Sequence, residues 1–409
     1  MKKTKAVILI IMICMCICAC RNSTDNENID SNNIEGQNVD LYKLGDSLIY
    51  SHSLILSYAT EFAVDYYIPY DCENDNTGDN VFRLITIAND GRFLVVPDLS
   101  ASTEYNMDEL VNGIPDDIKI ITSPKQIYLV ASQVMDMFAA IGAMDTLRFS
   151  ALRTEDWYIS EAVEYMEQGK LIYAGKYSAP DYELILEQGC DLVIENTMIY
   201  HTPKVKEMFE SFDIPVMVDR SSYEKEPLGR TEWVKLYGAL IGHEEEACMA
   251  FNAQLTEYES ALDEAELSGV PTVAFFYIAS NGTVKVRKSS DYLPKMIKMA
   301  GGEYIFSDLG NEGDNASSSI SLQMEQFYAD ARDADYIIYN STIDGELTCI
   351  DDLVSKNELL ANMKAVKENH VYCTSANLFQ STMETGTIIA DIHKILTGDD
   401  DLKYIFQLQ

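Results

Sequence analysis

Positive charge is scarce in this sequence of 409 residues: 30 Lys and Arg residues stand against 66 Asp and Glu residues, and the formal net charge is −36. A surface this acidic repels phosphate groups, so nucleic-acid binding is not expected. Attachment to an anionic membrane by charge alone is disfavoured for the same reason. The acidity on its own indicates solubility and names no partner.

The sequence also lacks the short motifs that build common catalytic sites. No GxxxxGK[ST] or GxGxxG segment occurs, so a nucleotide would find no glycine-built phosphate cradle. GxSxG and HExxH are absent, and the five histidines are scattered without metal-ligand spacing. Outside the first 20 residues the cysteines are widely spaced and form no CxxC pair, which disfavours zinc. We therefore expect no catalytic site, no metal site and no cofactor.

The first 20 residues, MKKTKAVILIIMICMCICAC, place three lysines before an unbroken apolar run. This pattern is typical of a secretory signal, and the run is shorter than the roughly 20 residues of a membrane-spanning helix. It closes with Ile17-Cys18-Ala19-Cys20, which resembles a bacterial lipobox. We expect cleavage before Cys20 and lipidation of this cysteine. A metal site built from the four cysteines of the segment is the competing interpretation.

Periodicity divides the remaining chain. A polar stretch follows the signal, and two β-rich runs then flank Asp90-Gly91, a hairpin signal. Two later series alternate strand-like and helix-like runs, and between them lies a segment without Pro or Gly that predicts one long helix. The predicted parts are a signal peptide (1–19), a flexible tether (20–40), a β-rich extension packed on the first lobe (41–120), an N-terminal α/β lobe (121–242), an interlobe helix (243–267) and a C-terminal α/β lobe (268–409). The expected fold class is α/β, with two Rossmann-like lobes joined by a long rigid helix and an extra N-terminal β-rich segment.

Several stretches carry a resemblance to a known family. They are IYLVASQVMDMFAAIGAMDTLRF, APDYELILEQGCDLVIENTMI, KMIKMAGGEYIF, LQMEQFYADARDADYIIYNSTI and LLANMKAVKENHVYCTS. Over roughly residues 120–409 the chain resembles the substrate-binding lipoproteins of ABC importers, in the class that carries iron-siderophores, haem or cobalamin. CDLV stands where typical members have PDLV, which marks a divergent branch.

The resemblance implies a ligand between the lobes, a lipid anchor on the extracytoplasmic face of the cell membrane, and an ABC permease as partner. The implied ligand is a small-molecule metal chelate, haem or corrinoid, and the protein is expected to act as a monomer. Glu183 and Glu325 match the two glutamates, one in each lobe, through which this family contacts its permease. Rim charges of this kind mainly set orientation and association rate. The alternative is that both are ordinary exposed helix residues.

Candidate ligand-binding residues follow from strand ends, because ligands of open α/β sheets lie there. The stretch YEKEPLGRTEWVKLYG follows the strand-like IPVMVD, and its Arg230, Trp233 and Tyr237 fall on one helical face. Arginine suits anionic oxygens, and aromatic rings suit a broad flat body. The alternative is that Trp233 and Tyr237 belong to the core and Arg230 is solvated. The assigned ligand-binding set is Trp157, Tyr177, Tyr200, Arg230, Trp233, Tyr277, Arg287, Tyr292 and Tyr339. Further strand-end candidates are Tyr158, Lys176, His201, Asn340 and Gln380.

The leading hypothesis is a tethered, non-enzymatic receptor that captures a chelated metal, haem or corrinoid and delivers it to a permease. A second is an enzyme on the same scaffold that modifies a chelate or haem, since fold does not fix function. A third is a cell-surface interaction protein that uses the acidic face and the extra N-terminal segment. Steady-state turnover distinguishes the second hypothesis from the first, and capture of partner proteins distinguishes the third.

Overall fold

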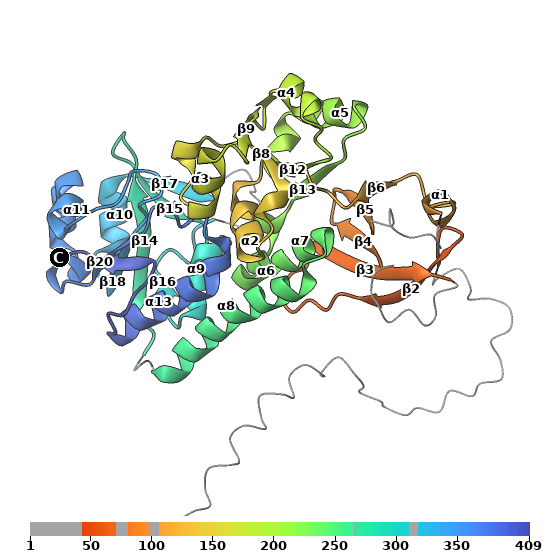
Figure 1. Cartoon of the computed structure of the whole chain (residues 1–409). Helices are drawn as coiled ribbons and strands as arrows, with labels where there is room; N and C mark the ends of the chain where they lie inside the picture. The colour runs from red at the N-terminus through yellow and green to blue at the C-terminus, as the bar shows by residue number, and fades with distance from the viewer. Residues whose placement is uncertain (1–42, 71–80, 98–105, 266, 268, 311–317) are drawn as a thin grey trace, which may run out of the picture. The chain divides into compact units, whose positions relative to one another are not determined.

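Three large β-sheets organise the part of the chain that the computed structural model describes, which comprises residues 43–70, 81–97, 106–265, 267, 269–310 and 318–409 (Figure 1). The first sheet belongs to the N-terminal extension, and its six strands lie in chain order. Strands β2 to β5 pair antiparallel, including the hairpin predicted at Asp90-Gly91, whereas β6 joins β5 in parallel. The elements are β1 (Lys43–Leu44), β2 (Leu48–Ser53), β3 (Phe62–Pro69), β4 (Phe82–Ile87), β5 (Gly91–Val96), α1 (Met107–Leu110) and β6 (Ile118–Thr122).

The first lobe is built on a parallel sheet of five strands in the order β13-β12-β7-β8-β9. Its inner strand β12 begins with an apolar run covered on both faces, as parallel strands require: Leu192 and Ile194 enter one core cluster and Val193 enters another. The strands are β7 (Ile127–Leu129), β8 (Leu147–Ser150), β9 (Ile172–Tyr173), β12 (Leu192–Asn196) and β13 (Val216–Asp219), with a small antiparallel pair β10 (Gly175–Lys176) and β11 (Ala179–Pro180). The helices are η2 (Ser132–Val134), α2 (Met135–Ala140), η3 (Met144–Thr146), η4 (Thr154–Asp156), α3 (Ser160–Glu167), α4 (Tyr182–Glu187), η5 (Thr197–His201), α5 (Pro203–Ser211), η6 (Ser221–Tyr223), α6 (Pro227–Glu232) and α7 (Val234–Ile241).

The second lobe has a sheet of seven strands in the order β17-β15-β14-β18-β19-β20, with β16 also paired to β14. Strands β14, β18 and β19 run parallel, and β15, β17 and β20 pair antiparallel at the two sides. The strands are β14 (Thr272–Ile278), β15 (Val284–Arg287), β16 (Glu303–Tyr304), β17 (Ser319–Leu322), β18 (Tyr336–Tyr339), β19 (Val371–Thr374) and β20 (Ile405–Gln407). The helices are α9 (Tyr292–Met299), α10 (Met324–Ala331), α11 (Ile350–Lys356), η7 (Glu358–Asn362), α12 (Lys364–Lys367), η8 (Thr382–Glu384) and α13 (Thr385–Thr397).

One long helix, α8 (Glu244–Glu264), connects the two lobes within the range predicted for it. It packs against α7 of the first lobe and α13 of the second, and Figure 1 shows it running past both. The contact with α13 is close because position 386 is glycine: a Cβ there would lie 2.0 Å from the carbonyl oxygen of Gln254. The predicted α/β fold with two lobes, a joining helix and an N-terminal β-rich segment is therefore confirmed.

The sheet of the extension shares a core with the first lobe. Phe62, Ile85 and Phe93 lie in the same apolar cluster as Trp233 and Tyr237, whereas the opposite face of the sheet covers a smaller cluster around Leu94. Burial of apolar surface contributes roughly 25 cal/mol per Å², so this shared core stabilises the packing of the extension on the lobe.

Two helices expected to be continuous are interrupted. The helix expected to begin at Pro227 divides into α6 and α7 at Trp233, and SKNELLANMKAV, whose pattern predicts one helix, divides into α11, η7 and α12. In the second case Asn357 is extended, and its side chain accepts the N–H of Leu359, so it caps a new turn. Among the described residues, no helix combines the length and the apolar character that crossing a membrane requires.

Candidate ligand-binding cleft

A hollow of about 520 Å³ lies between the two lobes, within the size range of small-molecule sites. It is bounded by the segments that follow β7, β12 and β13 in the first lobe and β18 and β19 in the second, the position expected for ligands of open α/β sheets. We call it the cleft. Its lining residues are Ser132, Gln133, Asn196, Thr197, Met198, Ser222, Arg230, Tyr277, Arg287, Asp291, Tyr292, Ser318, Ser319, Ile343 and Phe379.

Arg230 reaches the cleft from α6, which begins at Pro227 because proline fits the first turn of a helix. Its guanidinium carbon lies 3.9 Å from the centroid of the Tyr292 ring, which belongs to the second lobe. This cation–π contact spans the two lobes and holds a half-buried cation in the cleft.

Arg287 is the last residue of β15 and approaches the cleft from the second lobe. Its guanidinium donates to the Ser318 hydroxyl at 3.0 Å, lies 3.6 Å from an Asp291 oxygen and lies 5.1 Å from the centroid of the Phe379 ring. The Tyr304 hydroxyl accepts the Arg287 N–H at 2.9 Å and donates to the Arg287 carbonyl at 3.0 Å. Both the backbone and the side chain of Arg287 are therefore held in place.

The lining of the cleft is positively charged, in contrast to the whole chain. Two guanidinium groups against the single carboxylate of Asp291 leave a net charge of +1, whereas the chain carries −36. Burial raises the pKa of Asp291, although the nearby Arg287 and Arg230 oppose this rise. An anion is repelled by the outer surface but attracted once it enters the cleft.

Apolar and aromatic side chains form the rest of the wall. Met198, Ile343 and Phe379 are exposed by 46%, 62% and 37%, so they offer uncovered apolar surface at the cleft. Tyr277 and Tyr292 add two rings, and burial raises the pKa of Tyr292 against the opposing effect of the two arginines. Rings beside guanidinium groups suit a ligand with a broad apolar body and anionic oxygens.

The first lobe adds amide groups that its strand ends hold in position. Gln133 donates to the buried carboxylate of Asp219 at 2.7 Å, and the same carboxylate accepts the Tyr237 hydroxyl at 2.6 Å. Asn196 donates to the Val130 carbonyl at 3.4 Å. Side chains fixed in this way lose little further conformational freedom when a ligand binds.

Residues 128–378, more than half of the chain, match the family model described as periplasmic binding protein. The chain belongs to the periplasmic binding protein family. A curated relative, an uncharacterized lipoprotein of Methanocaldococcus jannaschii, is 27% identical over 288 residues, which cover 70% of this chain and 66% of the relative. An uncharacterized protein of the same organism is 25% identical over 59% of this chain and 73% of its own length. The chain thus spans slightly less than two-thirds of the first of these relatives.

Solved structures of periplasmic binding proteins share the fold. One from Veillonella parvula has a TM-score of 0.55 at 17% identity, covering 68% of this chain and 92% of its own. The periplasmic haem-binding protein HutB of Vibrio cholerae has a TM-score of 0.53 at 15% identity, covering 66% of this chain and 98% of its own. At such identities the likeness concerns the fold, and family membership rests on the sequence match.

Four of the predicted ligand-binding residues meet in the cleft: Arg230, Tyr277, Arg287 and Tyr292. Sequence reasoning did not name the remaining lining residues, among them Gln133, Asn196 and Phe379. Gln133 and Phe379 follow predicted parallel strands and Asn196 ends one, but residues near strand ends are too numerous for this position alone to single them out.

Trp233 and Tyr339 of the predicted ligand-binding set do not line the cleft, and neither does Tyr237, which was expected on the same helical face as Arg230 and Trp233. All three are fully buried. The Trp233 indole donates to Glu224 at 2.8 Å and packs 5.0 Å from the Phe62 ring, centroid to centroid. Tyr339 lies inside the second lobe, where its hydroxyl donates to Asp344 at 3.2 Å. Their polar atoms are already paired, so they serve packing.

The other predicted residues also lie outside the cleft lining. Trp157 is buried and donates to the Ser150 hydroxyl at 3.2 Å, Tyr177 packs half-buried against the outer core of the first lobe, and Tyr200 is exposed beside Arg220. The further strand-end candidates Tyr158, Lys176, His201, Asn340 and Gln380 do not line it either. The Gln380 side chain instead hydrogen-bonds the backbone of residues 156 and 158 across the lobes.

Glu183 and Glu325 are both exposed in the first turn of a helix, α4 and α10 respectively. Neither carboxylate makes a hydrogen bond or ion pair with another described residue. Cys20 lies outside the described residues. Within the described part of the chain, no group of three or more His, Cys, Asp or Glu side chains is placed to hold a metal ion.

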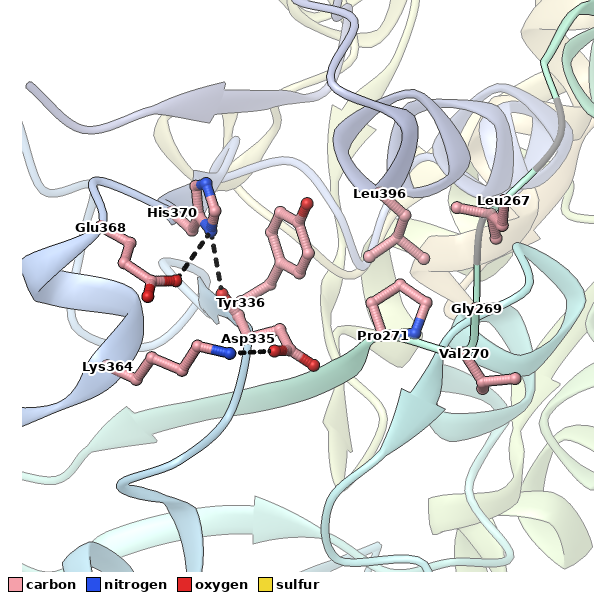
Figure 2. Close-up of a pocket in the computed structure, with 10 residues that line it drawn as sticks. All are labelled: Leu267, Gly269, Val270, Pro271, Asp335, Tyr336, Lys364, Glu368, His370 and Leu396. Atoms are coloured by element: carbon pink, nitrogen blue, oxygen red, sulfur yellow. Dashed lines mark hydrogen bonds and ion pairs between the residues drawn. The ribbon is translucent and has the colours of Figure 1, made fainter.

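A second hollow, of about 410 Å³, lies on the second lobe (Figure 2). It opens where β14, β18 and β19 begin, away from the strand ends that form the cleft. Its charged groups contact one another: Lys364 lies 2.5 Å from Asp335, and the Glu368 carboxylate lies 3.8 Å from a ring nitrogen of His370. The cleft is therefore the better candidate for the ligand site.

Proposed function

We propose that this protein is an extracytoplasmic solute-binding lipoprotein of an ABC importer, and that it binds a metal chelate, haem or corrinoid in the cleft. The observation that carries the proposal is the pairing of two arginines with aromatic rings at the boundary between lobes, in a lining of net charge +1. Catecholates, citrate-type chelates, haem and corrinoids all combine a broad body with anionic or polar oxygens. Charge-assisted hydrogen bonds from arginine suit those oxygens.

The family and the curated relatives support the cellular placement. Periplasmic binding proteins are solute-binding proteins, and the lipoprotein relative agrees with the lipobox-like end of the signal segment. In this proposal Cys20 carries the lipid, and acyl chains anchor the protein at roughly 0.8 kcal/mol per buried CH₂. Haem-binding proteins among the structural neighbours make haem one member of the ligand panel worth testing first.

The proposal is tested by titrating the mature chain, with Cys20→Ser to prevent lipidation, against haemin, cyanocobalamin, ferric citrate, a ferric catecholate and a ferric hydroxamate. We expect one of these to bind reversibly at a ratio of one to one. Calorimetry or equilibrium dialysis is the suitable readout, because Trp157 and Trp233 are buried and do not face the cleft. Binding of none of the five, or continuous turnover of one, would contradict the proposal.

Charge reversal of the two exposed glutamates tests docking to the permease. Glu183→Lys and Glu325→Lys are each expected to lower ligand uptake about tenfold or more in cells, because misplaced charge costs both orientation and association rate. Ligand binding by the purified variants should be unchanged. Glu167→Lys, also an exposed helix glutamate of the first lobe, is the matched control. Normal uptake by both docking variants would show that these residues do not contact the permease.

A further inference from the structure

A short segment of the extension is held by two buried carboxylates of the first lobe. We call the segment Ser57–Glu61 the strap. The backbone N–H groups of its first three residues donate to Glu232 at 2.7–3.0 Å. Those of its last two residues donate to Glu224 at 2.9–3.0 Å. Five consecutive amides are thus satisfied by side chains more than 160 residues away.

The two carboxylates flank α6, the helix that carries Arg230. Glu224 precedes it, accepts the Trp233 indole N–H at 2.8 Å and is 5% exposed; Glu232 is its last residue and is fully buried. Lys235 completes the set with a 2.7 Å contact to Glu232. Burial raises the pKa of Glu232, but the Lys235 ammonium and the strap amides outweigh it and hold the pKa below its usual value. Glu232 is therefore ionised and fully paired at neutral pH.

The strap lies directly on α6. A Cβ at Gly229 would sit 3.1 Å from the carbonyl oxygen of Tyr58, so the strap backbone approaches the helix closely. On another side α6 meets the second lobe: Thr231 donates to the Thr382 carbonyl at 3.0 Å, and Lys295 bonds the Lys225 carbonyl just before the helix. The helix is thus held between the strap and the second lobe.

We propose that the N-terminal extension is part of the ligand-binding apparatus, because the strap fixes α6 and so positions Arg230 over Tyr292 in the cleft. Glu224 and Glu232 act as positioning residues. If the cleft binds an anionic ligand, as in the proposed function, the affinity for that ligand depends on the extension.

The length of α6 explains why such support matters. Six residues make less than two turns, and helices this short are unstable without tertiary contacts. A long arginine side chain also loses affinity for a ligand when its helix moves, because its conformational freedom must then be lost on binding. The strap removes that freedom before the ligand arrives.

A double-mutant cycle with haemin as the probe tests the coupling. Glu232→Gln removes the charge that holds the strap and is expected to weaken haemin binding about tenfold. Arg230→Gln should weaken it at least as much. The double variant should bind no more weakly than Arg230→Gln alone, since the strap acts through Arg230. Additive losses would overturn the proposal, because they would mean that Glu232 affects affinity by general destabilisation.

Asp90→Asn is the matched control. Asp90 also fastens the extension to the first lobe, by accepting the Val218 N–H at 2.9 Å and pairing with Lys206 at 2.5 Å, but it has no bond to α6. Its loss should lower stability and leave the haemin affinity unchanged. If Glu232→Gln fails to fold, Gly229→Ala replaces it, because the added Cβ pushes on the strap from within the helix.

Amide hydrogen exchange of the ligand-free protein tests this inference independently of the proposed function. Glu232→Gln, or Gly229→Ala in its place, should speed exchange across residues 227–236, whereas Asp90→Asn should act only near residues 88–91 and 216–218. Unchanged exchange in α6 would overturn the positioning role even if haemin binds. If the wild-type chain does not bind haemin but α6 loosens as expected, haem is excluded as the ligand and the positioning role is supported.

Discussion

Removing both cleft arginines, by Arg230→Gln and Arg287→Gln together, is expected to weaken ligand binding by at least about a hundredfold. Hydrogen bonds to charged groups contribute about 1.5–3 kcal/mol each, so two such losses correspond to a factor of this size or larger. The lining would change from +1 to −1, since only Asp291 would remain charged. An anion would then be repelled by the cleft as well as by the outer surface.

Each single variant should lose roughly ten- to a hundredfold and should also show a weaker dependence of affinity on salt. Calorimetric titration with the compound that binds the wild-type chain measures both effects. Arg332→Gln is the control, because Arg332 is largely exposed on the second lobe and does not line the cleft. Wild-type affinity in the double variant would place the ligand elsewhere, with the hollow of Figure 2 as the next candidate.

The fold followed from the sequence because its signals are local. Buried strands such as β18 are continuous apolar or aromatic runs, and α8 is a long segment without Gly or Pro. The break at Trp233 had no such signal. It lies between α6 and α7, directly after Glu232, and the carboxylates of Glu232 and Glu224 accept hydrogen bonds from the distant amides of residues 57–61.

Part of the candidate site could be predicted from the sequence for the same reason. Arg230 lies after β13 and Arg287 ends β15, so the rule that ligands lie at strand ends predicted both as ligand-binding residues, and both line the cleft. The rule could not tell which side of the backbone an aromatic side chain takes, so Tyr339 and Trp233 were assigned to the ligand although both are packed in cores. The residue type determines which interactions a side chain can make, and long-range packing determines whether that side chain faces the cleft or the core.

The stretch from Tyr223 to Gly238 illustrates both outcomes. Arg230 lines the cleft, and its contact with a ligand stays a prediction. Three of its other polar residues, Glu224, Glu232 and Lys235, are buried: the two glutamates bind the strap amides, and Lys235 pairs with Glu232. Charged residues beside an aromatic residue suggest a ligand site in the sequence. In the structure, several of these charged groups instead bind the N-terminal extension to the first lobe.

Glu195 is expected to make the protein less stable as pH rises, and Glu195→Gln should abolish that effect. Glu195 lies on β12, is fully buried, and neither carboxylate oxygen has a hydrogen bond of normal geometry among the described residues. Burial raises its pKa from 4.5 to about 8, against smaller opposing effects of the Asn196 backbone and Lys206. The folded protein therefore keeps this carboxyl protonated under conditions in which the unfolded chain ionises it.

The direction of the effect follows from linkage. Because the folded pKa lies above the unfolded one, the stabilisation is complete below about pH 4.5 and is lost as pH rises toward about 8. One pKa unit corresponds to about 1.4 kcal/mol, so the total loss of unfolding free energy is on the order of 5 kcal/mol at most. The Glu195→Gln variant carries a neutral amide at every pH, so its free energy of unfolding should not show this loss.

Urea unfolding of the wild-type chain and Glu195→Gln at pH 5.5, 7 and 8.5 measures the difference. The variant should match or fall slightly below the wild type at pH 5.5 and exceed it by a few kcal/mol at pH 8.5. Asp136, whose pKa burial raises to about 7, contributes a loss of the same sign to both proteins and cancels in the comparison. Parallel stability curves would mean that Glu195 is hydrated or paired in solution.

Glu232 supplies the physical contrast, because it is equally buried and yet its pKa is lowered. Three backbone amides and the Lys235 ammonium satisfy its charge, whereas Glu195 lacks such donors. Glu232→Gln should therefore destabilise the protein above its folded pKa, and the stability that Glu232 provides should vanish as pH falls through that pKa. Opposite signs of the two Gln substitutions at pH 8.5 would show that hydrogen bonding, and not burial alone, decides whether a core carboxylate stabilises this fold.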